Sequence, residues 1–146
     1  ALFNSDSSRV ATASFDGTAR VWDAKSGATL CPPLHHGAKV LQASFSPEGR
    51  RILTSSIDQV TRVWDYAPAD PVAVSIARGD RVRHLEFSPD GRLILVVGND
   101  STVFVWDANS GQALTSPLVH SNVTYACFSP DGRKIATVSH DQTACV

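Results

Sequence analysis

The chain has 146 residues, of which 42% are apolar and 18% charged, and its formal net charge is −1. The composition is ordinary for a globular protein. The small net charge excludes a general electrostatic attraction to nucleic acid or to anionic membranes, and no apolar run approaches the roughly 20 residues that a membrane span requires. We therefore expect neither nucleic acid nor a membrane among the partners of this protein.

Residues 1–34 predict part of a β-sheet. Residues 1–3 are a stub of a first strand, and "FNSDSSRVA" from Phe3 leads into a second strand. The phrase "DGTARVWDAKSG", from Asp16 to Gly27, supplies a turn and a third strand that ends on a Trp-Asp pair, and a fourth strand follows. Strand-forming runs separated by Gly, Asp and Ser are typical of antiparallel strands joined by tight turns.

Residues 35–77 predict a complete four-stranded sheet. "PEGR" supplies the turn between the first two strands, and "DQ" is a short hairpin connector between the second and third. No stretch has the apolar spacing of a helix without a Gly or Pro break, so we expect no helix. The expected strands are Val40–Ser46, Arg51–Ile57, 60–66 and Pro71–Ala77.

The remaining residues repeat this plan with a fixed period. Trp22, Trp64 and Trp106 stand 42 residues apart, and "FSPEGRRIL" returns as "FSPDGRLIL" and "FSPDGRKIA". Four strands in each repeat of about 40 residues are typical of a β-propeller, in which four-stranded antiparallel blades stack radially. We therefore predict an all-β propeller segment with a partial blade at 1–34, complete blades at 35–77 and 78–118, and a partial blade at 119–146.

The first and last blades are each interrupted by an end of the chain. We expect the chain to be a piece of a longer polypeptide, and an assembling half-propeller is the alternative; the total number of blades stays open. Open terminal blades expose apolar faces and unpaired strand edges, so we also expect self-association through them.

The phrases "FSPDGR", "D-x-T-x-x-x-W" and "VWD", repeated in register along the whole chain, resemble those of the WD-repeat β-propeller family. The resemblance implies a polar network in each blade, which joins a His before the first strand, a Ser or Thr in the second strand, the Asp of a tight turn and the Trp of the third strand. By position these are His36, Thr54 or Ser56, Asp58 and Trp64 in the second blade; Thr12 or Ser14, Asp16 and Trp22 in the first; Asp100 and Trp106 in the third; and His120, Thr137 or Ser139 and Asp141 in the fourth.

The network of the third blade departs from this pattern. Arg78 stands at the His position, and Val96 and Gly98 occupy the second strand where the hydroxyl is expected. We therefore expect the third network to fail, so that the indole of Trp106 has no hydroxyl partner.

Catalytic and metal-binding interpretations fit the same residues less well. Ser56, His36 and Asp58 are the residue types of a nucleophilic triad, but the types recur in every repeat, and mutual satisfaction of buried polar groups explains them more simply. Cys31 beside His35 and His36 lacks zinc-site spacing, and there is no Gly-rich phosphate loop. We expect no enzymatic activity, no metal and no cofactor.

The three cysteines of the chain have no paired spacing. This pattern indicates reduced structural thiols and a cytoplasmic location.

In WD-repeat proteins, partners commonly dock on the top face of the propeller. The resemblance places there the residues that open the first strand of a blade and those that precede the turn Asp. Phe15 and Ile57 are candidate apolar anchors, although Ile57 packing under a neighbouring blade is an equal alternative. The candidate top-face residues are Phe15, Lys39, Leu41, Ile57, Arg81, Arg83, Asn99, Asn122, Thr124 and His140.

These observations predict a non-enzymatic protein–protein interaction scaffold whose partners are other proteins or peptides. The links "LCPPLHH" and "LTSPLVH" look like those in large bacterial WD-repeat proteins, some of which carry a protein kinase domain. The alternative is therefore a structural or regulatory propeller segment of a larger bacterial polypeptide with a separate catalytic domain.

Overall fold

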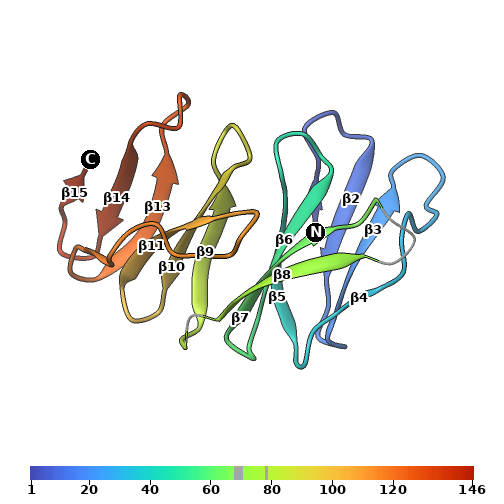
Figure 1. Cartoon of the computed structure of the whole chain (residues 1–146), viewed down its shortest axis with the longest axis horizontal. Coiled ribbons are helices and arrows are strands. Elements are labelled where there is room, and N and C mark those ends of the chain that lie inside the picture. The colour runs from blue at the N-terminus through green and yellow to red at the C-terminus, as the bar shows by residue number, and fades with distance from the viewer. Residues whose placement is uncertain (68–70, 78) are drawn as a thin grey trace. The chain divides into compact units, whose positions relative to one another are not determined.

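The structure is a computed structural model that describes residues 1–67, 71–77 and 79–146 (Figure 1). This part of the chain contains fifteen strands and no helix, which confirms the predicted all-β fold class. The described residues accordingly hold no helix of the length and hydropathy that a membrane span needs. The chain divides into two compact units, Ala1–Gly79 and Asp80–Val146.

The first unit contains two four-stranded antiparallel sheets, each an up-and-down meander in which consecutive strands are neighbours. Short turns connect the central strands, as expected for hairpins with Gly, Asp and Ser in their connections. The first sheet consists of β1 (Leu2–Phe3), β2 (Arg9–Ala13), β3 (Thr18–Asp23) and β4 (Leu34–His35), and the second of β5 (Val40–Phe45), β6 (Arg51–Ser56), β7 (Val60–Asp65) and β8 (Val72–Ala77).

The second unit repeats the meander in one four-stranded and one three-stranded sheet. The third sheet consists of β9 (Val82–Phe87), β10 (Leu93–Gly98), β11 (Thr102–Asp107) and β12 (Leu118–Val119), and the fourth of β13 (Val123–Phe128), β14 (Ile135–Ser139) and β15 (Ala144–Cys145).

Each strand expected in the second sheet is observed and is one residue shorter than expected; the first three are Val40–Phe45, Arg51–Ser56 and Val60–Asp65. The expected fourth strand Pro71–Ala77 is observed as Val72–Ala77. The boundaries expected at 34/35 and 118/119 fall inside β4 and β12, because His35 pairs with Thr18 and Leu118 with Val103. Arg78, expected at the His position of the third blade, lies outside the described residues.

The core of each unit lies between its two sheets. Residues 52–56 of β6 and 94–98 of β10 are all buried, so both faces of these second strands are covered. In the first unit β5 packs against β1, β2 and β3, and in the second β13 packs against β9, β10 and β11. Burial on both faces explains why β10 is the continuous apolar run "LILVVG" and not an alternating sequence.

A turn in the second sheet requires glycine. Gly49 has φ +69, in the left-handed region, and its N–H donates to Ser46 O at 2.8 Å. A Cβ at Gly49 would lie 3.4 Å from Asn4 Nδ2. The "SPEG" phrase therefore has glycine where the chain reverses between β5 and β6, because a side chain is strained in this backbone conformation.

We expect Gly49→Ala to lower the free energy of unfolding of the first unit by about 1–2 kcal/mol, the usual cost of a left-handed non-glycine residue. Gly37→Ala is the matched control, because Gly37 is not left-handed and its Cβ would make ordinary van der Waals contact with Asp58 Oδ2 at 3.5 Å. Chemical denaturation followed by tryptophan fluorescence measures both. Equal losses for the two variants would contradict the backbone argument.

Candidate functional site

The Thr54 hydroxyl is the centre of a buried polar network in the second sheet. Trp64 Nε1 donates to Thr54 Oγ1 at 2.9 Å, and His36 Nε2 lies 2.7 Å from the same oxygen. Thr54 is fully buried and the His36 side chain is inaccessible to solvent. The network therefore joins β6, β7 and the segment between β4 and β5 through one side-chain oxygen.

The protonation state of His36 follows from its other neighbour, Arg62. Arg62 Nη1 is in hydrogen-bond contact with His36 Nδ1, and because a guanidinium only donates, Nδ1 must be the acceptor. The proton of the neutral imidazole is then on Nε2, which donates to Thr54 Oγ1. That oxygen accepts two N–H donors, and its own hydrogen is directed to Arg62 O at 3.4 Å. Every member of the network is satisfied in this arrangement.

Burial of His36, and secondly the Arg62 charge, lower the pKa of the imidazole from 6.5 to about 4. The Asp58 carboxylate acts in the opposite direction but stands 3.8 Å from Nδ1. Arg62 Nη1 also donates to Asp58 Oδ2 at 3.1 Å, so the arginine bridges the histidine and the aspartate. The imidazole is therefore neutral at pH 7, as the donor pattern requires.

Arg62 belongs to the network although the sequence pattern did not predict it. The signal was present, because "TARVWD" and "VTRVWD" both place an arginine two residues before the tryptophan and four residues after the turn aspartate. In the first sheet the corresponding Arg20 pairs with Asp16 at 3.4 Å. The recurring D-x-x-x-R spacing is thus the sequence feature of this ion pair.

Of the two hydroxyls considered for the second sheet, Ser56 lies outside the indole network. Ser56 Oγ donates to Ala38 O at 3.0 Å and accepts from Asp58 N at 3.3 Å. Asp58 Oδ1 in turn accepts the N–H of Val60 at 3.0 Å. Ser56 and Asp58 therefore hold the β6–β7 turn, and Ser56 has neither the histidine contact nor the exposure of a catalytic nucleophile.

The first sheet has the same threonine pairing. Trp22 Nε1 donates to Thr12 Oγ1 at 3.0 Å, while Ser14 Oγ accepts from Asp16 N at 3.2 Å. The hydroxyl and the backbone N–H of Thr18 both donate to the Asp16 carboxylate and lower its pKa to about 2. Asp16 is therefore ionised throughout the physiological range.

The third sheet differs from the first two at its tryptophan. Trp106 Nε1 is buried, and no hydrogen-bond partner for it exists among the described residues. Val96 occupies the position that Thr54 holds in the second sheet, and Phe104 replaces Arg62, with its ring centroid 5.9 Å from that of Trp106. An apolar cluster thus stands where the second sheet has its polar network, while the Asp100 carboxylate still accepts from Thr102 N at 3.0 Å.

In the fourth sheet His120 contacts two threonines. Its Nδ1 lies 2.8 Å from Thr137 Oγ1 and its Nε2 2.6 Å from Thr143 Oγ1. Ser139 donates to Ser121 O, so here too the threonine contacts the histidine and the serine holds the turn. The Thr143 hydroxyl also donates to Asp141 Oδ1 and is the first cause of the lowered pKa of that carboxyl.

Cys31, with His35 and His36 nearby in the sequence, is the residue to test for metal binding. Among the described residues no group of three His, Cys, Asp or Glu side chains is placed to hold a metal ion. Cys31 itself is half-buried, and burial raises the pKa of its thiol, which keeps the sulfur protonated and a poor metal ligand.

A surface hollow of about 350 Å³ lies between the two sheets of the first unit, and His36 of the second-sheet network is one of its lining residues. Phe15 is 71% exposed, and Lys39 Nζ lies 5.1 Å from the centroid of its ring. Ile57 is half-buried at the edge of the hollow. The lining residues are Phe15, Asp16, Gly17, His36, Gly37, Ala38, Lys39 and Ile57.

Backbone hydrogen bonds bring the predicted top-face residues together in pairs. Ile57 N donates to Lys39 O at 3.0 Å, Asn99 N to Arg81 O at 2.9 Å and His140 N to Asn122 O at 3.1 Å. The residue before each turn aspartate is thereby held beside the residue that opens the first strand. The same bond recurs in three sheets, but the paired side chains differ from sheet to sheet.

The remaining top-face residues lie at β-bulges. The register shifts between Val40 and Gln42, at Leu41. Corresponding shifts in the third and fourth sheets occur at Arg83 and at Thr124. A bulge re-aims a side chain out of the regular alternation, and Leu41 and Arg83 are exposed. The sequence placed these residues near the start of the strand without indicating the bulges.

The meander sheets, the Trp–Thr pairs and the Asp-held turns together define a repeat protein with blades of the β-propeller type. The WD40 family model, described as "WD domain, G-beta repeat", matches residues 1–23, 29–65, 71–107 and 111–146. The chain belongs to this family, whose members commonly are protein-interaction scaffolds and usually are not catalysts. Among curated proteins no match to this chain was found.

We expect Trp64→Phe to lower the free energy of unfolding by about 1–3 kcal/mol, because it removes the indole donor to the buried Thr54 hydroxyl. Trp106→Phe is the matched control and should lose less of this polar contribution, since Trp106 Nε1 has no partner among the described residues. Paired denaturation midpoints provide the measurement. An equal or larger loss at Trp106 would contradict the network as described.

The neutral His36 predicts acid sensitivity. Its pKa in the folded protein is about 4, below the ordinary 6.5 of the unfolded chain, so its contribution to stability is present above pH 6.5 and is lost as the pH falls to 4. The expected loss is about 2 kcal/mol, with allowance for screening of the neighbouring charges by solvent. Denaturation at a series of pH values, with His36→Gln as the non-titrating control, measures this loss. If the free energy of unfolding depends on pH equally in the wild type and the His36→Gln variant, the loss is due to other groups.

Proposed function

We propose that this protein is a non-enzymatic interaction scaffold that binds another protein or a peptide at the hollow around Phe15. The observation that carries the proposal is the exposure of Phe15: a 71% exposed aromatic ring stands over a hollow, with the Lys39 ammonium group 5.1 Å from the ring centroid. Aromatic side chains at the centre of an interface commonly contribute a large share of binding energy.

The framework around the hollow supports a preformed site. His36 N donates to Gly17 O at 2.8 Å, and Val40 N donates to Ser14 O at 3.0 Å, so backbone bonds connect its two sides. Gly17 has φ +86, and a Cβ there would lie 3.4 Å from His36 O, so the turn that carries Phe15 stays close to the second sheet. A site held by backbone bonds orders few groups on binding, which favours affinity.

The chemistry of the lining defines the class of partner. Phe15 and Ile57 offer apolar surface, and Lys39 occupies one side of the aromatic ring. An apolar or aromatic side chain of the partner fits against Phe15 and Ile57, while the polar groups of the rim, Asp16 and Lys39, set its orientation. The site residues therefore act by contact and not by chemical reaction.

Selection of binding peptides from a random displayed library, followed by affinity measurement, tests this proposal. We expect Phe15→Ala to weaken the selected peptides about tenfold or more, as for a hot-spot residue. Val72→Ala is the matched control, because Val72 is 64% exposed in the same unit but does not line the hollow. Peptides that bind the wild type and the Phe15→Ala protein alike would contradict the proposal.

A further inference from the structure

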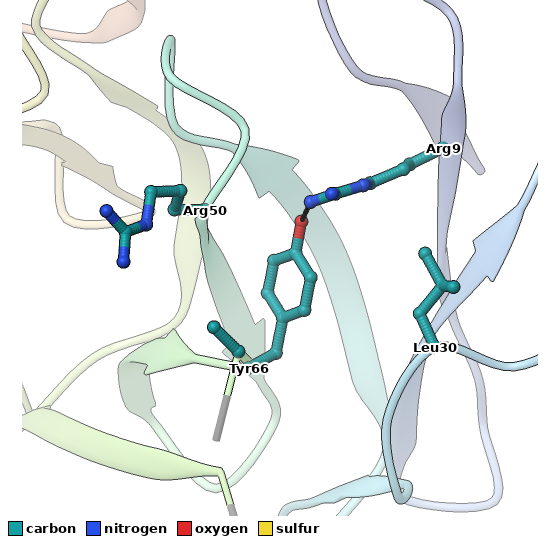
Figure 2. Close-up of a pocket in the computed structure, with 5 residues that line it drawn as sticks. Arg9, Leu30, Arg50 and Tyr66 are labelled. Carbon is teal, nitrogen blue, oxygen red and sulfur yellow. Dashed lines mark hydrogen bonds between the residues drawn. The ribbon is translucent and has the colours of Figure 1, made fainter. Parts of the chain in front are cut away.

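A second hollow lies at the opposite end of the sheets in the first unit (Figure 2). Arg9 begins β2 and pairs with Asp23, whereas Ala13 ends β2 and leads into the turn that carries Phe15. The length of β2 separates these ends by about 13 Å. The second hollow measures about 330 Å³ and is lined by Arg9, Leu30, Arg50, Tyr66 and Ala67.

Arg9 is held in place by one of its two terminal nitrogens. Nη1 donates to Gly49 O at 2.9 Å and to Tyr66 Oη at 2.6 Å, and the Tyr66 hydroxyl donates to Gly49 O. Figure 2 shows the guanidinium and the phenol end to end. A guanidinium has five N–H groups, so those on Nε and Nη2 remain without a partner in the described part of the chain. The Arg9 guanidinium is thus held in place by Nη1, and its Nε and Nη2 groups can donate to a ligand.

Arg50 supplies a second cation, and Leu30 supplies an apolar wall. Arg50 is exposed, and its guanidinium has no hydrogen-bond or ion-pair partner among the described residues. Leu30 is 42% exposed, and Figure 2 shows it on the opposite side of Tyr66 from Arg50. Two cationic residues and an apolar side chain therefore line the hollow, and the Arg50 guanidinium is directed away from Tyr66 in Figure 2.

The repeat itself does not require this arrangement. Blade construction needs the tryptophan, the threonine and the turn aspartate, but Tyr66 follows the Trp-Asp pair where the first and third sheets have Ala24 and Ala108. The tyrosine at this position is thus specific to the second sheet. A feature that departs from the repeat is explained by local function more readily than by the common architecture.

We propose that this hollow binds an acidic side chain of an extended peptide, with a neighbouring apolar side chain of the peptide on Leu30. A guanidinium binds a carboxylate with matched geometry. The carboxylates of Asp6 and Asp23 lie within Coulombic range of Arg9 and offset part of its charge, which favours a singly charged carboxylate over a doubly charged phosphate. This site is separate from the Phe15 surface.

Fluorescence anisotropy with defined probes tests this assignment. The probe is an end-capped, fluorescein-labelled peptide in which Leu and Asp alternate, and the matched probe has Asn in place of Asp. We expect saturable binding of the Asp peptide that weakens as salt is added. Arg50→Gln should reduce affinity about three- to fivefold, as for an exposed charge pair, and Leu30→Ala should reduce it about threefold or more through lost apolar contact.

Two control variants separate this site from general charge and from the Phe15 surface. Lys25→Gln removes a positive charge, as Arg50→Gln does, just after the end of β3 at Asp23, but Lys25 does not line the hollow. Phe15→Ala alters the other site. Neither should change the affinity. Equal binding of the Asp and Asn peptides, equal effects of Lys25→Gln and Arg50→Gln, or displacement by inorganic phosphate without dependence on Leu30 would each overturn the proposal.

Discussion

The structure depends on covering both faces of the second strand in the second and third sheets. β6 and β10 are buried at five consecutive positions, and a strand buried in this way needs packing partners on both sides. Thr54, a polar residue in the middle of β6, is therefore removed from water and must find its hydrogen bonds within the protein. The Trp64 and His36 donors meet that requirement, so the polar network is a consequence of the burial.

The third sheet shows a second way to meet the same constraint. Val96 replaces the threonine, Phe104 replaces the arginine, and the strand becomes wholly apolar. Removing the hydroxyl leaves Trp106 Nε1 buried without an acceptor among the described residues, which is unfavourable by about 1–3 kcal/mol. Val96 and Phe104 are cross-strand partners where the second sheet has Thr54 and Arg62. Blades of one chain therefore share a backbone plan and differ in what stabilises it.

The sequence repeat and the sheet are offset from each other along the chain. The family match from 29 to 65 includes β4, yet β4 pairs with β3 of the first sheet. The match from 111 to 146 likewise includes β12, which pairs with β11. A sequence repeat thus begins with the last strand of the preceding sheet, and consecutive sheets of the chain are connected in this way. The offset also places His36 between two sheets, where the polar network of one sheet borders the Phe15 hollow.

The sequence by itself determined the strand order, the all-β class and the recurring Trp and Asp positions, because a repeated pattern of turns and apolar strands admits few architectures. The tertiary structure decided between Thr54 and Ser56, placed Arg62 between His36 and Asp58, and put the bulges beside Leu41 and Thr124. It also brought Arg9 to Tyr66, 57 residues away. These contacts depend on distances between strands and sheets, which a one-dimensional period does not contain.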